Sequence, residues 1–282
     1  MHIIVPIKQV PETSNVKMDP VTGTMIRDGV ESIINPLDLY AIEAANLLRD
    51  EHGGKVTVLS MGPASAEKAL REAIAMGCDD AVLVTDRAFA GSDTWSTSYV
   101  LAKAIDKIGE YDLILCGERA TDGDTGQVGP NIAAALDVPV ATYVSSIESI
   151  DLESRTAVVW RMTEYGYEKL QVSLPALLTV VKEISFPRLP TLRGKQRARK
   201  TDIPIFNTSN LSVEEDKIGL KGSPTRVVKI ETPKVTRGGK LVKVTDGRLS
   251  KNQRNHIGGG NAASRSMDHC RSASRQVKKR FA

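Results

Sequence analysis

The chain has 282 residues, of which 41% are hydrophobic and only 4% are aromatic. This length suits one large α/β domain with appendages, whereas so few aromatic side chains argue against a stacking platform for single-stranded nucleic acid. The net charge of +4 is uneven, because residues 246–282 hold nine Lys or Arg against two Asp, so the body of the protein is not basic and no nucleic-acid partner is expected.

Strand and helix patterns alternate through the first half of the chain. Residues 2–8 predict a buried strand, and residues 17–25 predict a small hairpin around a Pro-x-x-Gly turn. Asn35 as cap and Pro36 in the first turn predict a helix that runs to about residue 52. Its buried face is expected to hold Leu37, Tyr40, Ala41, Ala44, Leu47 and Leu48.

The same alternation continues to residue 116. Strands are predicted at 55–61, 81–85 and 111–116, with helices from about 65 to 76 and from about 94 to 108 between them. Gly77 is expected to end the first of these helices. Such spacing predicts an α/β fold with a mainly parallel sheet and helices on both faces.

After Pro139 the pattern changes. Residues 157–161, 168–172 and 176–181 predict strands without helices between them, which we interpret as an antiparallel extension of the sheet, and the core is expected to end at Lys182. Pro204, Pro224 and Pro233 interrupt any regular element in residues 202–244. These residues are expected to bury few of their side chains against their own chain, so this arm wraps a partner or stays disordered.

Four parts of the chain follow from these patterns. Residues 1–185 are predicted to be the α/β domain, and residues 186–201 a basic segment. Residues 202–245 are the C-terminal arm, and residues 246–282 form a basic tail rich in Gly and Ser that is expected to be disordered.

The most informative stretch is the polar loop that follows the strand at 111–116. It contains Asp122, Gly123, Asp124, Thr125, Gly126, Gln127, Val128, Gly129, Pro130 and Asn131, and it leads into a short apolar helix. A strand, a small-residue loop and a helix N-terminus together direct backbone N–H groups at a phosphate. The loop is longer than most strand-to-helix connections, which favours a nucleotide site over an ordinary turn whose Asp and Thr only cap the helix.

Several known chemistries are missing from the sequence. No phosphate-binding Gly-x-x-x-x-Gly-Lys-Ser/Thr loop and no Gly-x-Gly-x-x-Gly fingerprint is present. The four His stand at positions 2, 52, 256 and 269, and the three Cys, at 78, 116 and 270, share no metal-ligand spacing. We therefore expect no metal site and no catalytic residues, so a bound cofactor would have to carry any chemistry and the chain's status as an enzyme stays open.

Nothing in the sequence indicates export or membrane insertion. Residues 1–6 begin directly with a strand pattern rather than a signal peptide, and no run of about 18 apolar residues occurs. A cytoplasmic protein without a transmembrane segment is expected.

Several motifs together resemble the beta subunit of electron transfer flavoprotein over roughly residues 1–240. They are Val-Pro-Ile-Lys-Gln-Val-Pro at 5–11, Asn-Pro-Leu-Asp at 35–38, Met-Gly-Pro at 61–63, the loop at 117–131, Leu-Pro-Ala at 174–176 and Pro-Arg-x-x-x-Leu at 187–192. The region 159–179 resembles the family signature, with Arg161, Glu164, Glu168 and Pro175 in place; it departs from it at Tyr165.

The resemblance implies a Rossmann-like (adenine-nucleotide-hydrolase-like) fold, with residues 1–185 as the nucleotide- or flavin-binding domain. It also implies a heterodimer with an alpha subunit that carries the working FAD, while the beta subunit binds an adenine nucleotide. By position, that nucleotide would contact Pro6, Asn35, Pro36, Leu37, Asp38, Met61 and residues 122–131. The segment around Leu192 resembles the family's anchor for acyl-CoA dehydrogenase-type or other flavin dehydrogenases, and the arm at 202–245 would embrace the alpha subunit.

The loop at 122–130 and the Gly-Ser-Asp-Thr turn at 91–94 are similar to the electron-bifurcating branch of the family. There a second FAD, reduced by NADH, replaces AMP, and Asp93, Thr94 and Thr97 would add to its site. Two alternatives stay open: a non-bifurcating carrier with AMP as structural ligand, and a nucleotide-binding regulatory α/β protein. The sequence does not identify the dehydrogenase, its substrate or the role of the basic tail.

Overall fold

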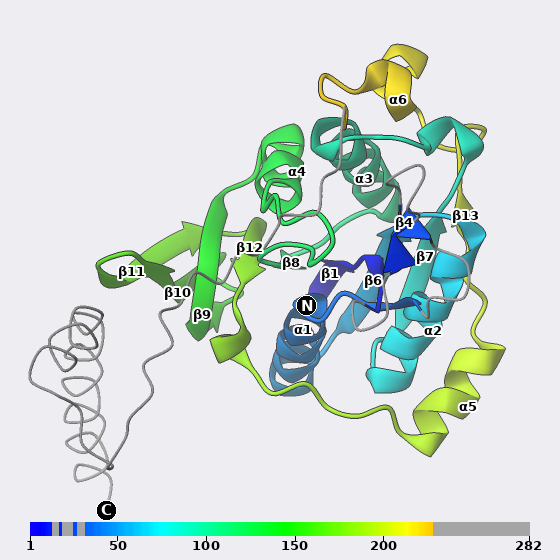
Figure 1. Cartoon of the computed structure of the whole chain (residues 1–282). Helices are drawn as coiled ribbons and strands as arrows, with labels where there is room; N and C mark the ends of the chain where they lie inside the picture. The colour runs from blue at the N-terminus through cyan, green and yellow to red at the C-terminus, as the bar shows by residue number, and fades with distance from the viewer. Residues whose placement is uncertain (13–16, 19–24, 27–31, 228–282) are drawn as a thin grey trace, which may run out of the picture. The chain divides into compact units, whose positions relative to one another are not determined.

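The main sheet of the protein has nine strands. The computed structural model describes residues 1–12, 17–18, 25–26 and 32–227 (Figure 1). The sheet order is β11-β10-β9-β12-β8-β1-β6-β7-β13. The strands are β1 (His2–Pro6), β6 (Lys55–Met61), β7 (Asp80–Val84), β8 (Leu113–Gly117), β9 (Val140–Asp151), β10 (Thr156–Thr163), β11 (Gly166–Ser173), β12 (Ala176–Val180) and β13 (Ile205–Phe206).

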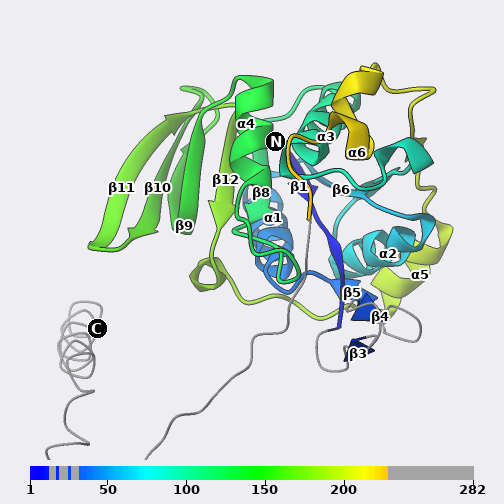
Figure 2. The same cartoon turned by 45° about the horizontal axis from the view of Figure 1, so that its top comes forward.

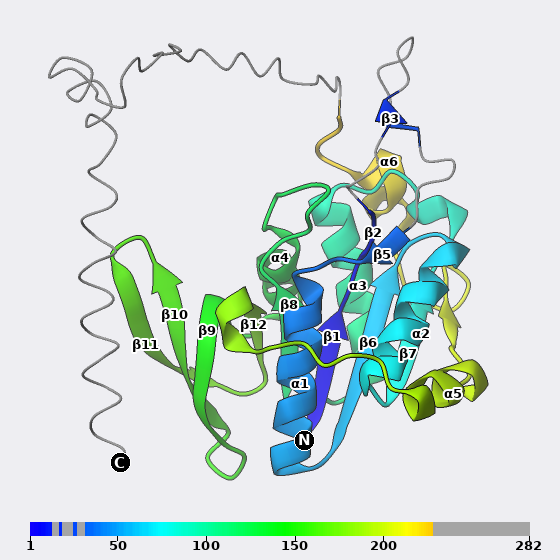
Figure 3. The same cartoon turned by 60° about the horizontal axis from the view of Figure 1, so that its bottom comes forward.

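Helices cover both faces of the parallel part of the sheet. α1 (Asp38–His52) and α2 (Glu67–Met76) lie in front of it in Figure 3, and α3 (Thr94–Ile108) lies behind it. α4 (Val128–Leu136) packs on α3. Because side chains alternate along each strand, Ile3 and Val5 of β1 join the core under α1 and α2, whereas Ile4 joins the core under α3 and α4. The predicted α/β class, with helices on both faces, is confirmed.

The smaller elements lie at the edges of this body. β2 (Gln9–Pro11) pairs with β5 (Ser32–Ile34), and β3 (Lys17–Met18) pairs with β4 (Met25–Ile26), so the two ends of the predicted hairpin do meet. The Pro-x-x-Gly turn between them lies outside the described residues. Short 3-10 turns occur at Ala64–Ala66, Arg87–Phe89, Lys182–Ile184 and Glu215–Lys217. Over the described residues, no helix combines the length and apolar character that crossing a membrane requires.

Two expectations about α1 are wrong. Asn35 does not cap the helix, because a turn at residues 36–37 precedes it and makes Leu37 the N-cap residue, without a side-chain cap. Leu47 is 48% exposed, because the buried stripe runs through Ala41, Ala45 and Leu48 and leaves Leu47 to one side. Gly77 ends α2 as predicted, with a φ of 131° that few other residues adopt.

The antiparallel extension consists of β9, β10 and β11, which project sideways from the helix-covered body in Figure 2. β9 was not predicted, because half of its residues are exposed and give no apolar run. The strand at 176–181 was expected to be antiparallel, but β12 is parallel to β8 and β9. It is also buried at all five positions, which is typical of a strand inside a parallel sheet.

The segment from 186 to 227 packs on the body more than the sequence predicts. α5 (Leu192–Lys200) packs on α2, and Ile205 and Phe206 pair with the free edge of β7. Leu211 and Ile218, which precedes α6 (Gly219–Gly222), are each 5% exposed in the core under α3. The expectations that the core ends at Lys182 and that residues beyond 202 bury little on their own chain are therefore wrong up to Ile218. Residues 228–282 lie outside the described residues.

Candidate functional site

The carboxyl ends of β1, β6 and β8 meet at one edge of the sheet. Pro6, Met61 and Gly117 are the last residues of these parallel strands. The strand order places β1 between β6 and β8, so the loop after β8 lies beside the segment that follows β1. Ligands of open α/β sheets bind outside such carboxyl ends, which makes this edge the candidate site.

The loop between β8 and α4 presents free backbone donors at this edge. Asp124 and Gly126 have left-handed φ values of 53° and 63°. Among the described residues, no acceptor is found for the N–H groups of Gly123, Thr125, Gly126, Gln127, Val128 and Gly129. The last two belong to the first turn of α4, whose N–H groups lie at the positive end of the helix dipole. The arrangement suits an anionic group such as a phosphate.

Asn35 fixes the start of this loop. Its side chain is 1% exposed; Nδ2 donates to the carbonyl oxygen of Arg119 at 2.9 Å, and Oδ1 accepts the N–H of Thr121 at 3.1 Å. An amide carries both donor and acceptor, so one side chain satisfies two backbone groups of the loop. Asn35 therefore holds the loop against the segment that begins α1.

Asp38, in the first turn of α1, forms the floor of the site. Its carboxylate accepts the N–H of Lys8 at 2.7 Å and Nδ2 of Asn35 at 2.9 Å, and the end of β8 at Gly117 lies close against it. Burial raises the pKa of Asp38 to about 7, against the lowering effect of the hydrogen bonds from Lys8 and Asn35. One buried carboxylate thus joins the chain segments that follow β1, β5 and β8.

Two ion pairs hold the acidic side chains of the loop. Nζ of Lys8 lies 2.7 Å from Asp122, and Nε of Arg119 lies 3.1 Å from Asp124. The N-cap residue of α4 is Gln127, and no side chain caps that helix. The alternative that these carboxylates only cap a helix is therefore wrong, and their charges are balanced beside the N–H groups.

In the turn before α3, Asp93 caps the helix and binds the C-terminal segment, whereas Thr94 contacts the loop. The carboxylate of Asp93 accepts the N–H of Ser96 at 3.0 Å, which caps α3, and the N–H and hydroxyl of Thr225 at 2.9 and 2.7 Å. The hydroxyl of Thr94 donates to Oε1 of Gln127 at 2.8 Å and so links this turn to the loop. Thr97 lies one helical turn further on, half-buried.

The structure brings most of the predicted residues to one edge. The loop and the start of α4 contain residues 122–131, and the segment that holds the loop contains Asn35, Pro36, Leu37 and Asp38. Pro6 and Met61 end the neighbouring strands, and Thr94 contacts Gln127. Asp93 faces the C-terminal segment, and Leu192 stands on α5, away from this edge. Sequence reasoning missed Lys8, Gly117 and Arg119. Lys8 follows the first strand, and its sequence position indicates a role at this site only once β1 is known to lie beside β8.

Lys8→Ala should weaken binding of a phosphate-bearing ligand about two- to five-fold, because a half-exposed ion pair contributes only about 0.2–1 kcal/mol. Titration calorimetry at low and high salt would show the loss shrinking as salt rises. Lys55→Ala is the matched control, because Lys55 is equally exposed, pairs with Asp80 at 3.7 Å and begins β6 at the opposite edge. Equal effects of the two variants would contradict a role for Lys8.

Comparisons with known proteins agree with this architecture. A sequence profile described as electron transfer flavoprotein domain matches residues 22–211. The electron transfer flavoprotein subunit beta of Thermoanaerobacterium thermosaccharolyticum is 52% identical over 86% of this chain and 92% of its own length. The caffeyl-CoA reductase-Etf complex subunit CarD of Acetobacterium woodii is 46% identical over 91% of this chain and all of its own length. Protein FixA of Azorhizobium caulinodans is 48% identical over 83% of this chain and 85% of its own length.

Proposed function

Because the chain belongs to the electron transfer flavoprotein family as a beta subunit, we propose that its edge site binds FAD and that it carries electrons as half of a heterodimer with an alpha subunit. The observation that carries the proposal is the loop at 117–127, with its free N–H groups above Asn35 and Asp38. Backbone donors, a helix N-terminus and balanced charges converge at this loop.

The residues of the edge fit the phosphates of a dinucleotide. The N–H groups of residues 125–129 would receive the pyrophosphate, and an added Cβ at Gly123 meets no atom within 4 Å, which leaves space beside them. Lys8 and Arg119, now paired with Asp122 and Asp124, are the cations within reach of that group. The two carboxylates are also acceptors for ribose hydroxyls.

The flavin would supply the redox chemistry, since the described residues offer no catalytic constellation. The chain's own contribution is to bind and orient it. Asn35 and Asp38 fix the loop, the first turn of α4 faces the phosphates, and Thr94 and Thr97 offer hydroxyls toward the remaining part of the ligand. Asp93 is engaged by Ser96 and Thr225, so its role is to close the turn and hold residue 225.

We further propose that NADH reduces this FAD and that the heterodimer bifurcates electrons. The support is the similarity of the loop and of the turn at 91–97 to the bifurcating branch, together with relatives that include a subunit of a caffeyl-CoA reductase-Etf complex. A phosphate cradle alone does not distinguish FAD from AMP. A carrier with AMP as structural ligand is therefore the second candidate.

The partners follow from the same proposal. The alpha subunit would be embraced by the chain beyond Ile218, where Leu220 and Val227 are exposed. A flavin dehydrogenase of the acyl-CoA dehydrogenase type would dock near Leu192, which is 82% exposed at the start of α5.

Cofactor extraction from the purified heterodimer tests the proposal. We expect two FAD and no AMP per heterodimer, and rapid reduction of one of the two flavins by NADH. The variant Gly117→Ala, which crowds the floor of the site, should retain only the FAD of the alpha subunit. One FAD with one AMP would establish the non-bifurcating carrier instead, and a colourless chain without nucleotide would refute both.

A further inference from the structure

Strand β9 contains one extra residue where it passes the edge of the sheet that holds the candidate site. Leu178 of β12 pairs with Ala141 and Val180 pairs with Val144, so two steps along β12 lie opposite three steps along β9. Val180 also pairs with Gly117, the last residue of β8, and the three strands lie side by side in Figure 2. Such a β-bulge turns a side chain into a new direction and is frequent beside functional sites.

Tyr143 lies in this bulge with a backbone conformation that bulky residues rarely adopt. Its φ is 57°, in the left-handed region. Three other described residues besides glycine have a positive φ, namely Asp124, Asp137 and Arg155, but they lie in loops or at the end of α4 rather than inside a strand. Strained backbone of this kind persists where the surrounding structure imposes it, and it occurs most often at functional sites.

Thr179 of β12 holds Tyr143 in this conformation. The Thr179 side chain is 2% exposed, and its Oγ1 accepts the N–H of Tyr143 at 3.1 Å. A Cβ added to Gly129, in the first turn of α4, would lie 2.7 Å from Cγ2 of the same threonine. Thr179 thus contacts both the bulge and the first turn of α4, so Tyr143 has a fixed position relative to the free N–H groups of that turn.

The hydroxyl end of Tyr143 points at the loop between β8 and α4. A Cβ added to Gly126 would lie 3.9 Å from the hydroxyl oxygen, and no other atom of Tyr143 comes within 4 Å of that position. The side chain is 48% exposed, and its hydroxyl forms no hydrogen bond with the residues that the structure describes. A phenol can donate one hydrogen bond. A side-chain donor therefore lies beside the free N–H of Gly126.

We propose that Tyr143 is a further ligand-contacting residue of the edge site and that its hydroxyl donates a hydrogen bond to the phosphate that the loop binds. This rests on the proposed function, which supplies a nucleotide as the ligand. The hydroxyl, rather than the face of the ring, is the part of Tyr143 nearest the loop, so a hydrogen bond fits the geometry better than stacking on a base or flavin. A phosphate is common to AMP and FAD, and hydrogen bonds to charged acceptors are the stronger ones.

The experiment measures how tightly AMP, FAD and adenosine bind to the heterodimer after removal of its beta-site ligand. Adenosine has no phosphate, so it separates a contact with the phosphate from a contact with the nucleoside. We expect Tyr143→Phe to weaken the binding of AMP and of FAD about ten-fold, as loss of one hydrogen bond to a charged group does, and to leave adenosine binding unchanged. Tyr167→Phe is the matched control, because Tyr167 is 60% exposed on β11, two strands beyond β9.

Thr179 acts in this scheme as the positioning residue of Tyr143. Thr179→Val keeps the shape of the side chain but removes the acceptor for the N–H of Tyr143, whereas Thr179→Ser keeps the hydroxyl. We expect Thr179→Val to reproduce the loss of AMP affinity and Thr179→Ser to retain most of the wild-type affinity. When Thr179→Val and Tyr143→Phe are combined, the two losses should not add, because both remove the same hydrogen bond to the phosphate.

Three results would overturn the role of Tyr143. Equal losses for AMP and adenosine would place its contact on the nucleoside, and unchanged affinities in Tyr143→Phe would leave it without a contact. Loss of heterodimer formation in the same variant would assign Tyr143 to the alpha subunit. All three leave the proposed function standing, whereas a wild-type heterodimer that binds none of the three probes would refute that function together with the role of Tyr143.

Discussion

Gly117→Ala should lower the affinity for the nucleotide about thirty-fold and destabilise the fold by about 1–3 kcal/mol. An added Cβ would lie 2.4 Å from Oδ1 of Asp38 and 2.9 Å from the carbonyl carbon of Leu37. Both belong to the first turn of α1 or its cap, so the end of β8 must move away from that helix. The loop would then lose its two hydrogen bonds to Asn35, at about 1 kcal/mol each, which corresponds to the expected loss of affinity.

Gly123→Ala is the control for this variant. Gly123 belongs to the same loop, has no positive φ, and an added Cβ there meets no atom within 4 Å. Titration calorimetry and urea unfolding of both variants would separate crowding at the floor from a general effect of alanine in the loop. If Gly117→Ala bound the nucleotide as tightly as Gly123→Ala, the contact between β8 and α1 would have no role in the site.

Asp38→Asn should abolish a fall in stability that the wild-type protein shows between about pH 4 and pH 7. Burial raises the pKa of Asp38 from 3.8 to about 7 in the folded state. The folded protein therefore binds this proton more tightly than the unfolded chain, so the stabilisation is complete below about pH 4 and is lost as the pH rises to about 7. A shift of about 3 pH units corresponds to about 4 kcal/mol.

The difference between the unfolding free energies of wild type and variant is the quantity to measure. Asp50, Asp86 and Asp112 have lowered pKa values and contribute the opposite slope, which cancels in the difference. Asp106→Asn, at an exposed position of α3, is the control and should keep the wild-type slope. Parallel curves for wild type and Asp38→Asn from pH 4 to 7 would contradict the assignment.

The sequence predicts elements whose signals are local. β6 begins and ends at the predicted residues, and α2 ends at Gly77, because continuous apolar runs and helix-ending glycines are properties of neighbouring residues. β9 and the parallel direction of β12 depend on which strands lie beside them, and no local pattern carries that. The burial of Leu211 and Ile218 depends on the free edge of β7 and the exposed flank of α3, which only the fold supplies.

The same distinction applies to the site. The loop at 117–131 and the Asn-Pro-Leu-Asp motif are recognisable as motifs, and the structure places them together. The hydrogen-bond and ion-pair partners of single residues were less predictable from the sequence. Asn35 looks like a helix cap in sequence and instead holds a loop more than eighty residues away, and Lys8 acquires its partner only because β1 pairs with β8.

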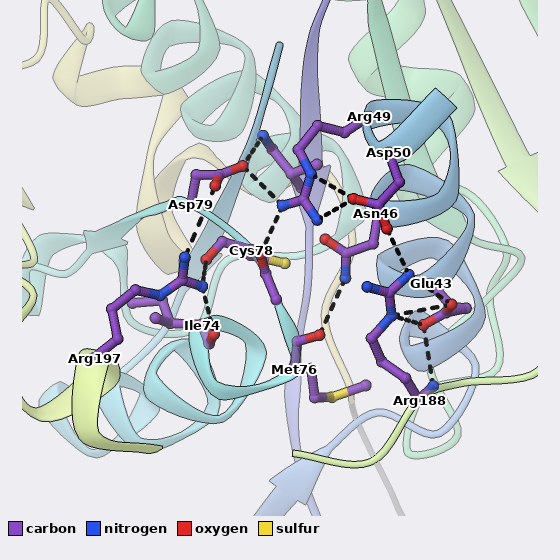
Figure 4. A network of polar contacts seen from close by, with 12 residues as sticks. Glu43, Asn46, Arg49, Asp50, Ile74, Met76, Cys78, Asp79, Arg188 and Arg197 are labelled. Atoms are coloured by element: carbon purple, nitrogen blue, oxygen red, sulfur yellow. Dashed lines mark hydrogen bonds and ion pairs between the residues drawn. The ribbon is translucent and has the colours of Figure 1, made fainter. Parts of the chain in front are cut away.

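α1 contacts two distant parts of the chain. Asp38, its first residue, forms the floor of the candidate site, and Glu43, five residues later, binds Arg188 in the segment between β12 and α5 (Figure 4). At 1.5 Å per residue, these carboxylates are about 7.5 Å apart along the axis. Both carboxylates belong to one helix of 15 residues. A tilt of its first turn, such as Gly117→Ala would impose, should therefore also displace Arg188 and the segment that Arg188 anchors.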